Sequence, residues 1–71
     1  MSTENTSRTL LTVEEAAGIL RRTPGTLRWW RHAGLGPRSF ALGRRVYYDE
    51  AELQGWIEAE AERTARGGDS A

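Results

Sequence analysis

Apolar residues recur every three or four positions early in the chain, which is the spacing of one face of a helix. They are Val13, Ala16, Ala17 and Leu20. Thr12 stands directly before them, and Glu15 follows three residues later, which is the arrangement of a capping box at a helix N-terminus. We therefore expect a first helix that begins after Thr12 and ends near Arg21 or Arg22.

The next apolar positions predict a second short helix. Thr23 suits the N-cap, and Pro24 suits the first helical position, where its missing N–H costs nothing. Leu27 and Trp30 follow at helical spacing, and Gly34 is a natural C-terminal cap. Two short helices joined by about two residues have the spacing of a helix-turn-helix.

Beyond the break at residues 36–37 the pattern changes to a period of two, which predicts a β-hairpin over residues 40–48. A three-residue turn at 43–45 puts four apolar side chains on one face. They are Phe40, Leu42, Val46 and Tyr48. We prefer this register to a two-residue turn because it buries more apolar surface, and it also places Arg44 and Arg45 at the hairpin tip.

A third helix is expected after Asp49, which suits an N-cap with Glu52 three residues later. Leu53, Trp56 and Ile57 give its core stripe, and it ends near residue 60 or 63. The pattern predicts a mostly α fold with a small β-hairpin: helix, turn, helix, two-stranded wing and third helix. We expect a disordered lead at residues 1–9, one winged helix-turn-helix domain at 10–63 and a flexible tail at 64–71.

The charges are segregated along the chain, although the net charge is zero. Residues 46–62 hold six acidic residues and no basic one, whereas residues 21–45 hold seven arginines and no acidic residue. These arginines are Arg21, Arg22, Arg28, Arg31, Arg38, Arg44 and Arg45. Because a polyanion responds to the local field rather than the total charge, this block favours nucleic-acid binding.

Composition gives little support to catalysis or to a metal site. The 71 residues include no cysteine, so a disulfide framework and a thiolate metal site are excluded. The single histidine, His32, is expected to be an ordinary surface residue near a phosphate or solvent. Glu50, Glu58 and Glu62 could share a helix face and hold a metal, but a solvated acidic face is the preferred interpretation. We therefore expect a non-enzymatic protein without cofactors. Because no long apolar run or signal-peptide pattern is present, we also expect it to be soluble in the cytoplasm.

The second helix has the features of a DNA-recognition helix. Its first residues are small, which lets the backbone approach the floor of a groove. Arg28, one turn in, can donate to guanine or phosphate, and Thr26 can contact a phosphate or a thymine methyl group. Arg21 and Arg22 are placed to hold the flanking backbone, while the hairpin tip suits the minor groove.

The aromatic residues divide between core and surface. Trp30 and Trp56 lie on expected core faces. Trp29 is undecided between the DNA backbone and a place under the third helix. Tyr47 points away from the apolar face of the expected hairpin, where it either donates to a phosphate or is simply half-exposed.

Four segments together resemble the excisionase-type, MerR-like winged helix-turn-helix family: Leu10–Ala17, Thr26–Arg31, Leu42–Tyr48 and Leu53–Ile57. The resemblance implies a second helix in the major groove and a wing touching the adjacent minor groove. With the residues argued above, the expected DNA contacts are Arg21, Arg22, Thr23, Pro24, Gly25, Thr26, Arg28, Trp29, Arg31, Arg44, Arg45 and Tyr47. We expect a departure from true MerR regulators, which carry a long dimerisation helix and an effector domain, although the Trp29–Trp30 pair resembles theirs.

We consider three functional hypotheses, of which the resemblance implies the first two. The first is an excisionase, a recombination directionality factor that binds repeated sites in cooperative copies, bends DNA and steers a phage-type integrase towards excision. The second is a small transcriptional regulator of the AlpA, BldC or MerR kind. The third is a protein-interaction module without DNA binding. The first two share double-stranded DNA as a partner, and none involves a membrane.

Overall fold

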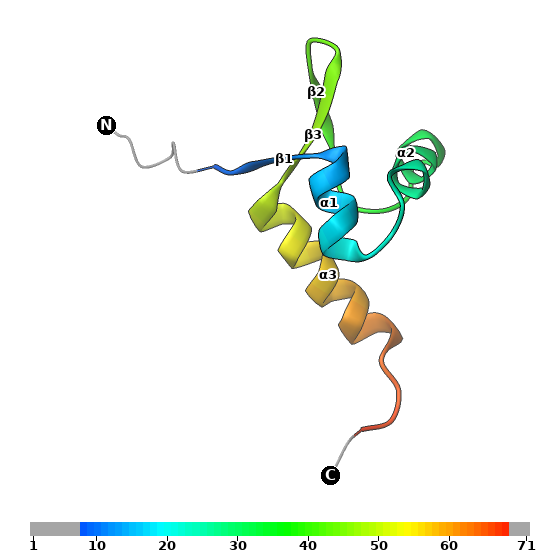
Figure 1. Ribbon diagram of the computed structural model, residues 1–71. Helices are drawn as coiled ribbons and strands as arrows, with labels where there is room; N and C mark the ends of the chain where they lie inside the picture. Colours follow the sequence, from blue (N-terminus) through cyan, green and yellow to red (C-terminus); the bar gives the residue numbers. More distant parts are fainter. Residues whose placement is uncertain (1–7, 69–71) are drawn as a thin grey trace, which may run out of the picture.

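A computed structural model describes residues 8–68 of the chain (Figure 1). The elements in chain order are β1 (Leu10–Thr12), α1 (Val13–Leu20), α2 (Pro24–Ala33), β2 (Phe40–Leu42), β3 (Arg45–Asp49) and α3 (Glu50–Thr64). The mostly α fold with a helix-turn-helix and a wing is confirmed. The expected lead falls mainly on residues 1–7, which lie outside the described part, and the expected tail is described only as far as residue 68.

The helix ends are where local chemistry places them. In the capping box of α1, the Thr12 hydroxyl accepts from the Glu15 N–H at 3.1 Å and the Glu15 carboxylate accepts from the Thr12 N–H at 2.9 Å. Thr23 caps α2 and Asp49 caps α3 by the same kind of side-chain contact. Gly34 ends α2 in the left-handed conformation, with φ of 78°. All four predicted caps are therefore confirmed.

The sheet has a third strand that the sequence pattern did not predict. β1 pairs antiparallel with β3, which also pairs with β2, so the strand order is β1-β3-β2. Leu11 lies opposite Tyr48 in this pairing, and both are buried. A strand of three residues has too few positions for a period of two to be visible, and its pairing partner is far away in the sequence.

The predicted hairpin register is wrong. Leu42 pairs with Arg45 and Phe40 pairs with Tyr47, so the turn has two residues, Gly43 and Arg44. Gly43 has a φ of +63°, which suits the first position of a tight hairpin turn. Arg44 is at the tip, as expected, whereas Arg45 is the first residue of β3.

The register decides which side chains face the core. Directly opposed residues share a face of the sheet, so Phe40 and Leu42 lie with Tyr47, on the face opposite Val46 and Tyr48. Leu42 is accordingly 52% exposed. The expectation of four apolar residues on one face is therefore wrong. Strand β1 adds the buried Leu11 to the inner face beside Tyr48, so Phe40 and Leu42 are not needed there.

The core gathers one or two side chains from most elements. Its buried members are Leu11, Ala16, Ala17, Leu27, Tyr48 and Leu53, with Val13, Leu20, Trp30, Val46 and Ile57 packed against them. Trp30 of α2 packs against this core, so the prediction that it is a core residue is confirmed. Trp56 of α3 is half-buried and contacts the Trp30 ring, with ring centroids 5.8 Å apart, but it is not itself packed against the buried core. Their contact attaches α3 to the helix-turn-helix.

The fold makes contacts from Arg8 onward, two residues before the expected domain start. The Thr9 carbonyl accepts from the Glu50 N–H at 2.9 Å. The Arg8 guanidinium lies 3.4 Å from the buried Asp49 carboxylate and 5.8 Å from the ring centroid of Phe40. Arg8 therefore covers the outer face of the sheet where α3 begins.

Candidate nucleic-acid interface

Helix α2 presents an exposed stripe on the side away from the core. Gly25, Arg28, Trp29 and His32 lie three or four residues apart and are all exposed, whereas Leu27 is fully buried. Trp29 is 59% exposed, so it does not pack under α3. Of its two expected positions, only the exposed one agrees with the structure. His32 was not among the expected site residues, although its position four residues after Arg28 places it on the same stripe.

The first turn of α2 is small and tightly capped. The Thr23 hydroxyl accepts from the Thr26 N–H at 3.2 Å and lies 3.0 Å from the Thr26 hydroxyl. Gly25 is exposed, and Pro24 occupies the first turn. This end of the helix therefore offers a low profile, but the Thr26 hydroxyl is already engaged by its neighbour.

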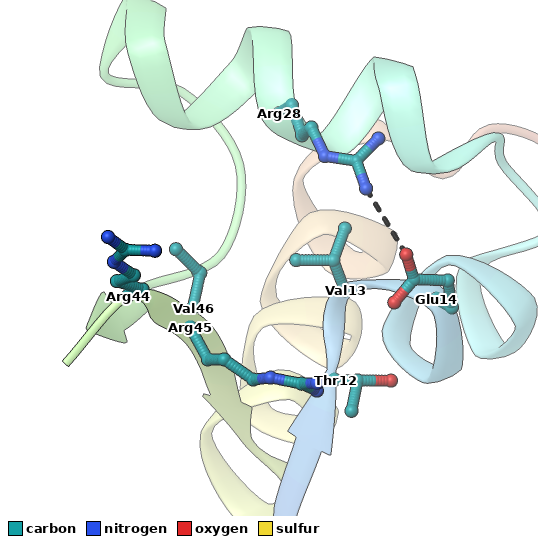
Figure 2. Close-up of a pocket in the computed structure, with 7 residues that line it drawn as sticks. All are labelled: Thr12, Val13, Glu14, Arg28, Arg44, Arg45 and Val46. Carbon is teal, nitrogen blue, oxygen red and sulfur yellow. Dashed lines mark hydrogen bonds and ion pairs between the residues drawn. The ribbon is translucent and has the colours of Figure 1, made fainter. Parts of the chain in front are cut away.

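Three expected site residues from two separate segments converge on one hollow of about 250 Å³ (Figure 2). Arg28 reaches into it from α2, and Arg44 and Arg45 line it from the wing. The remaining lining residues are Thr12, Val13, Glu14 and Val46. This convergence depends on the position of the wing relative to α2, and neither segment alone discloses it.

A second hollow of about 210 Å³ continues along α2. It shares Val13, Arg28 and Val46 with the first and adds Arg31, His32 and Tyr48. We refer to the two hollows together as the α2–wing groove. The groove has an apolar floor and basic side chains along its rim, which suits a phosphate backbone lying across it.

Carboxylates pair with two of the seven arginines of the basic block. The Arg28 guanidinium lies 3.2 Å from Glu14, and the Arg38 guanidinium lies 2.8 Å from Glu52. Within the described residues, no ion pair involves the four others that flank α2 or form the wing: Arg21, Arg22, Arg44 and Arg45. Both pairs are open to solvent, and such pairs contribute about 1 kcal/mol or less, so each carboxylate weakens the attraction of its guanidinium group for a phosphate without abolishing it.

The remaining expected contacts lie at the margins of the groove. Arg21 and Arg22 are exposed in the turn between α1 and α2 and do not line it. Arg31 lies on its rim and donates to the Ser39 hydroxyl at 2.8 Å. Tyr47 is half-buried on the opposite face of the sheet, beside Phe40, and so does not line the groove.

Tyr48 forms part of the groove floor. Burial raises the pKa of its phenol above the ordinary value of about 10, and this outweighs a hydrogen bond with Ser39 and the charges of Arg31 and Arg28, which act in the opposite direction. The phenol is therefore neutral at physiological pH. The positive rim of the groove is not offset by an anion from this tyrosine.

Among residues 8–68 no three histidine, cysteine, aspartate or glutamate side chains come close enough to hold a metal ion, so Glu50, Glu58 and Glu62 do not form such a cluster. Across the same residues no helix combines the length and the apolar character needed to cross a bilayer.

Comparison with known proteins gives one match. The sequence profile of the family described as helix-turn-helix domain matches residues 10–61. No curated protein and no solved structure gives a significant match to the chain. The matched range begins with β1 and ends within α3, so it contains the whole α2–wing groove.

Proposed function

Since the chain belongs to the helix-turn-helix domain family, we propose that it binds double-stranded DNA through the α2–wing groove. Helix α2 enters the major groove, and the wing contacts the adjacent minor groove. The observation that best supports this proposal is the meeting of Arg28 with Arg44 and Arg45 around one hollow. A duplex offers phosphates and base edges to such a surface at the same time.

The proposed contacts follow the position of each side chain. Arg28 reads a guanine from the exposed stripe of α2, and Trp29 lies against the DNA beside it. Arg44 and Arg45 bind the backbone at the minor groove. The other proposed backbone contacts lie before α2, in its first turn or near its end, and they are Arg21, Arg22, Thr23, Pro24, Gly25, Thr26 and Arg31. Tyr47 lies on the opposite face of the sheet, so it is proposed only as a contact from the outer side of the wing, outside the groove.

We further propose that the protein acts in the cytoplasm, at the nucleoid, as an excisionase, that is, a recombination directionality factor. One domain of this size reads only a few base pairs, so useful specificity needs several copies on repeated sites. The charge distribution supports such copies. The basic wing and the C-terminal end of the acidic helix α3 project in opposite directions, so these oppositely charged parts can meet between neighbouring copies (Figure 1). The exposed Glu58 and Glu62 of one copy then approach the basic groove side of the next.

Selection from random duplexes followed by footprinting tests this function. We expect enriched sequences, phased repeats in the footprint, bending of the DNA, and cooperative binding to an array of sites. Adding a phage-type integrase to the array should then promote excision. Binding to a single site as tight as binding to the array would contradict the cooperative role.

Two other outcomes would assign a different function. Cooperative binding that supports no excision but represses or activates an adjacent promoter would identify a small transcriptional regulator with the same fold. If no duplex showed a salt-dependent shift, DNA binding itself would be excluded and a protein-interaction module would remain.

A further inference from the structure

Glu14 is the only carboxylate among the residues that line the α2–wing groove (Figure 2). It lies in the first turn of α1, and its side chain is 66% exposed. In a surface that binds DNA, an exposed carboxylate repels phosphates and should lower affinity. Its presence there calls for a role other than attraction of the duplex.

The contact that Glu14 makes suggests that role. Its Oε2 accepts a hydrogen bond from Nη2 of Arg28 at 3.2 Å, across the gap between α1 and α2. A guanidinium has five N–H donors in a fixed fork, so one contact through Nη2 leaves the other donors available. Among the described residues those other donors have no hydrogen-bond partner.

We infer that Glu14 is a positioning residue, which holds Arg28 ready for a base edge and withholds it from phosphates. This inference rests on the proposed function. With its charge matched by Glu14, Arg28 gains little from a phosphate on an arbitrary duplex. On a duplex with a guanine beneath α2, the restrained guanidinium donates to O6 and N7 with less loss of side-chain freedom. Glu14 therefore lowers random binding and favours the cognate site.

The test compares binding to the best sequence selected from random duplexes with binding to a random-sequence duplex of the same length. In Glu14→Gln, affinity for the random duplex should rise up to about fivefold, because the carboxylate no longer competes for Arg28. The dependence of log affinity on log salt for that duplex should also steepen by about 0.9, the contribution of one additional phosphate contact. The ratio of selected to random affinity should fall.

A double-mutant cycle connects these effects to Arg28. Glu14→Gln should leave the ratio and the salt dependence unchanged when Arg28 is already alanine. Glu14→Asp keeps the charge but shortens the side chain, and it should also lower the ratio. The matched control is Glu52→Gln, which frees Arg38 from the other ion pair between separate elements and should leave the ratio unchanged.

The outcomes separate this inference from the function on which it rests. If the wild-type protein shows no salt-dependent binding to any duplex, both are overturned. If it binds but Glu14→Gln raises affinity for both duplexes by the same factor, Glu14 is only a repulsive charge and the inference fails. An unchanged affinity in Glu14→Gln, with thermal unfolding showing that the variant is folded, would also overturn it.

Discussion

Arg28 is the side chain that we propose contributes most to sequence recognition. It lies on the exposed stripe of α2 and lines both hollows of the α2–wing groove. We expect Arg28→Ala to weaken binding by about 1–3 kcal/mol, with a larger loss on the selected site than on a random duplex. Gel-shift or fluorescence-anisotropy titrations with both duplexes measure this difference.

The control for Arg28→Ala is Arg38→Ala. Arg38 also forms an exposed ion pair with a carboxylate from another helix, but it does not line the groove. Its loss should change the two affinities equally, if at all. An equal loss on both duplexes for Arg28→Ala would reduce Arg28 to a phosphate contact.

Tyr48 predicts a dependence of stability on alkaline pH. Its pKa is raised by burial, so an unfolded chain loses this proton near pH 10 while the folded protein still retains it. The folded state then binds more protons than the unfolded state, and the free energy of unfolding falls as the pH rises above about 10. Tyr48→Phe has no proton to lose here, so its free energy of unfolding should decline less over the same range.

Urea denaturation at pH values of about 8 and about 11 measures this effect. Tyr47→Phe is the matched control, because Tyr47 is the neighbouring tyrosine in β3, on the opposite face of the sheet, and this variant keeps Tyr48. It should retain the decline of the wild-type protein. A decline in Tyr48→Phe as large as in the wild-type protein would show that Tyr48 is not its source.

Among the elements, α2 depends on its N-cap for both its stability and its low profile. The Thr23 hydroxyl accepts from the Thr26 N–H at 3.2 Å, in addition to the 3.0 Å hydrogen bond between that N–H and the Thr23 carbonyl. Thr23→Ala should lower the free energy of unfolding by about 1 kcal/mol, with an unchanged denaturant m-value. Equilibrium unfolding in urea measures both quantities.

Thr64→Ala provides the comparison for this cap. The Thr64 hydroxyl donates to the Glu60 carbonyl at the exposed end of α3, where a local contact contributes little. Its removal should change the free energy of unfolding by about 0.5 kcal/mol or less. If Thr23→Ala has no larger effect than this, the cap does not stabilise α2.

The sequence predicts helix ends better than strand pairing, and the reason is physical. Thr12, Thr23 and Asp49 cap through hydrogen bonds to residues three positions away, so each signal lies within one short segment. The register of the hairpin depends instead on what lies across the sheet. Leu11 of β1 completes the inner face beside Tyr48, and this removes the advantage of turning Phe40 inward.

At the scale of the whole molecule, zero net charge conceals a polar distribution. Helix α2 and the wing, which carry the arginines of the groove, lie apart from the C-terminal half of α3, which carries Glu58, Glu60 and Glu62 (Figure 1). The sequence discloses this separation, because the acidic and basic residues occupy different stretches of the chain. On the proposed function, a duplex would meet a positive surface although the protein is neutral overall.

The composition of the candidate site was only partly predictable. The stretch 21–45 indicated which arginines are present, but whether Arg28 and the wing lie on one groove depends on tertiary packing. The pairing of Arg28 with Glu14 brings together residues fourteen positions apart and could not be read from the acid-free stretch. Trp29 remained undecided from its helix position alone, and its exposure became clear only from the packed structure.

The salt dependence of binding to a random duplex tests most directly whether the α2–wing groove holds DNA. For the wild-type protein, log affinity should fall steeply with log salt. The variant with both Arg44→Ala and Arg45→Ala should give a slope shallower by about 1.8, or about 0.9 for each lost phosphate contact. The variant with Arg63→Ala and Arg66→Ala removes the same charge near the end of α3 and should keep the wild-type slope. A flat wild-type slope, or equal slopes for the two double variants, would contradict the account.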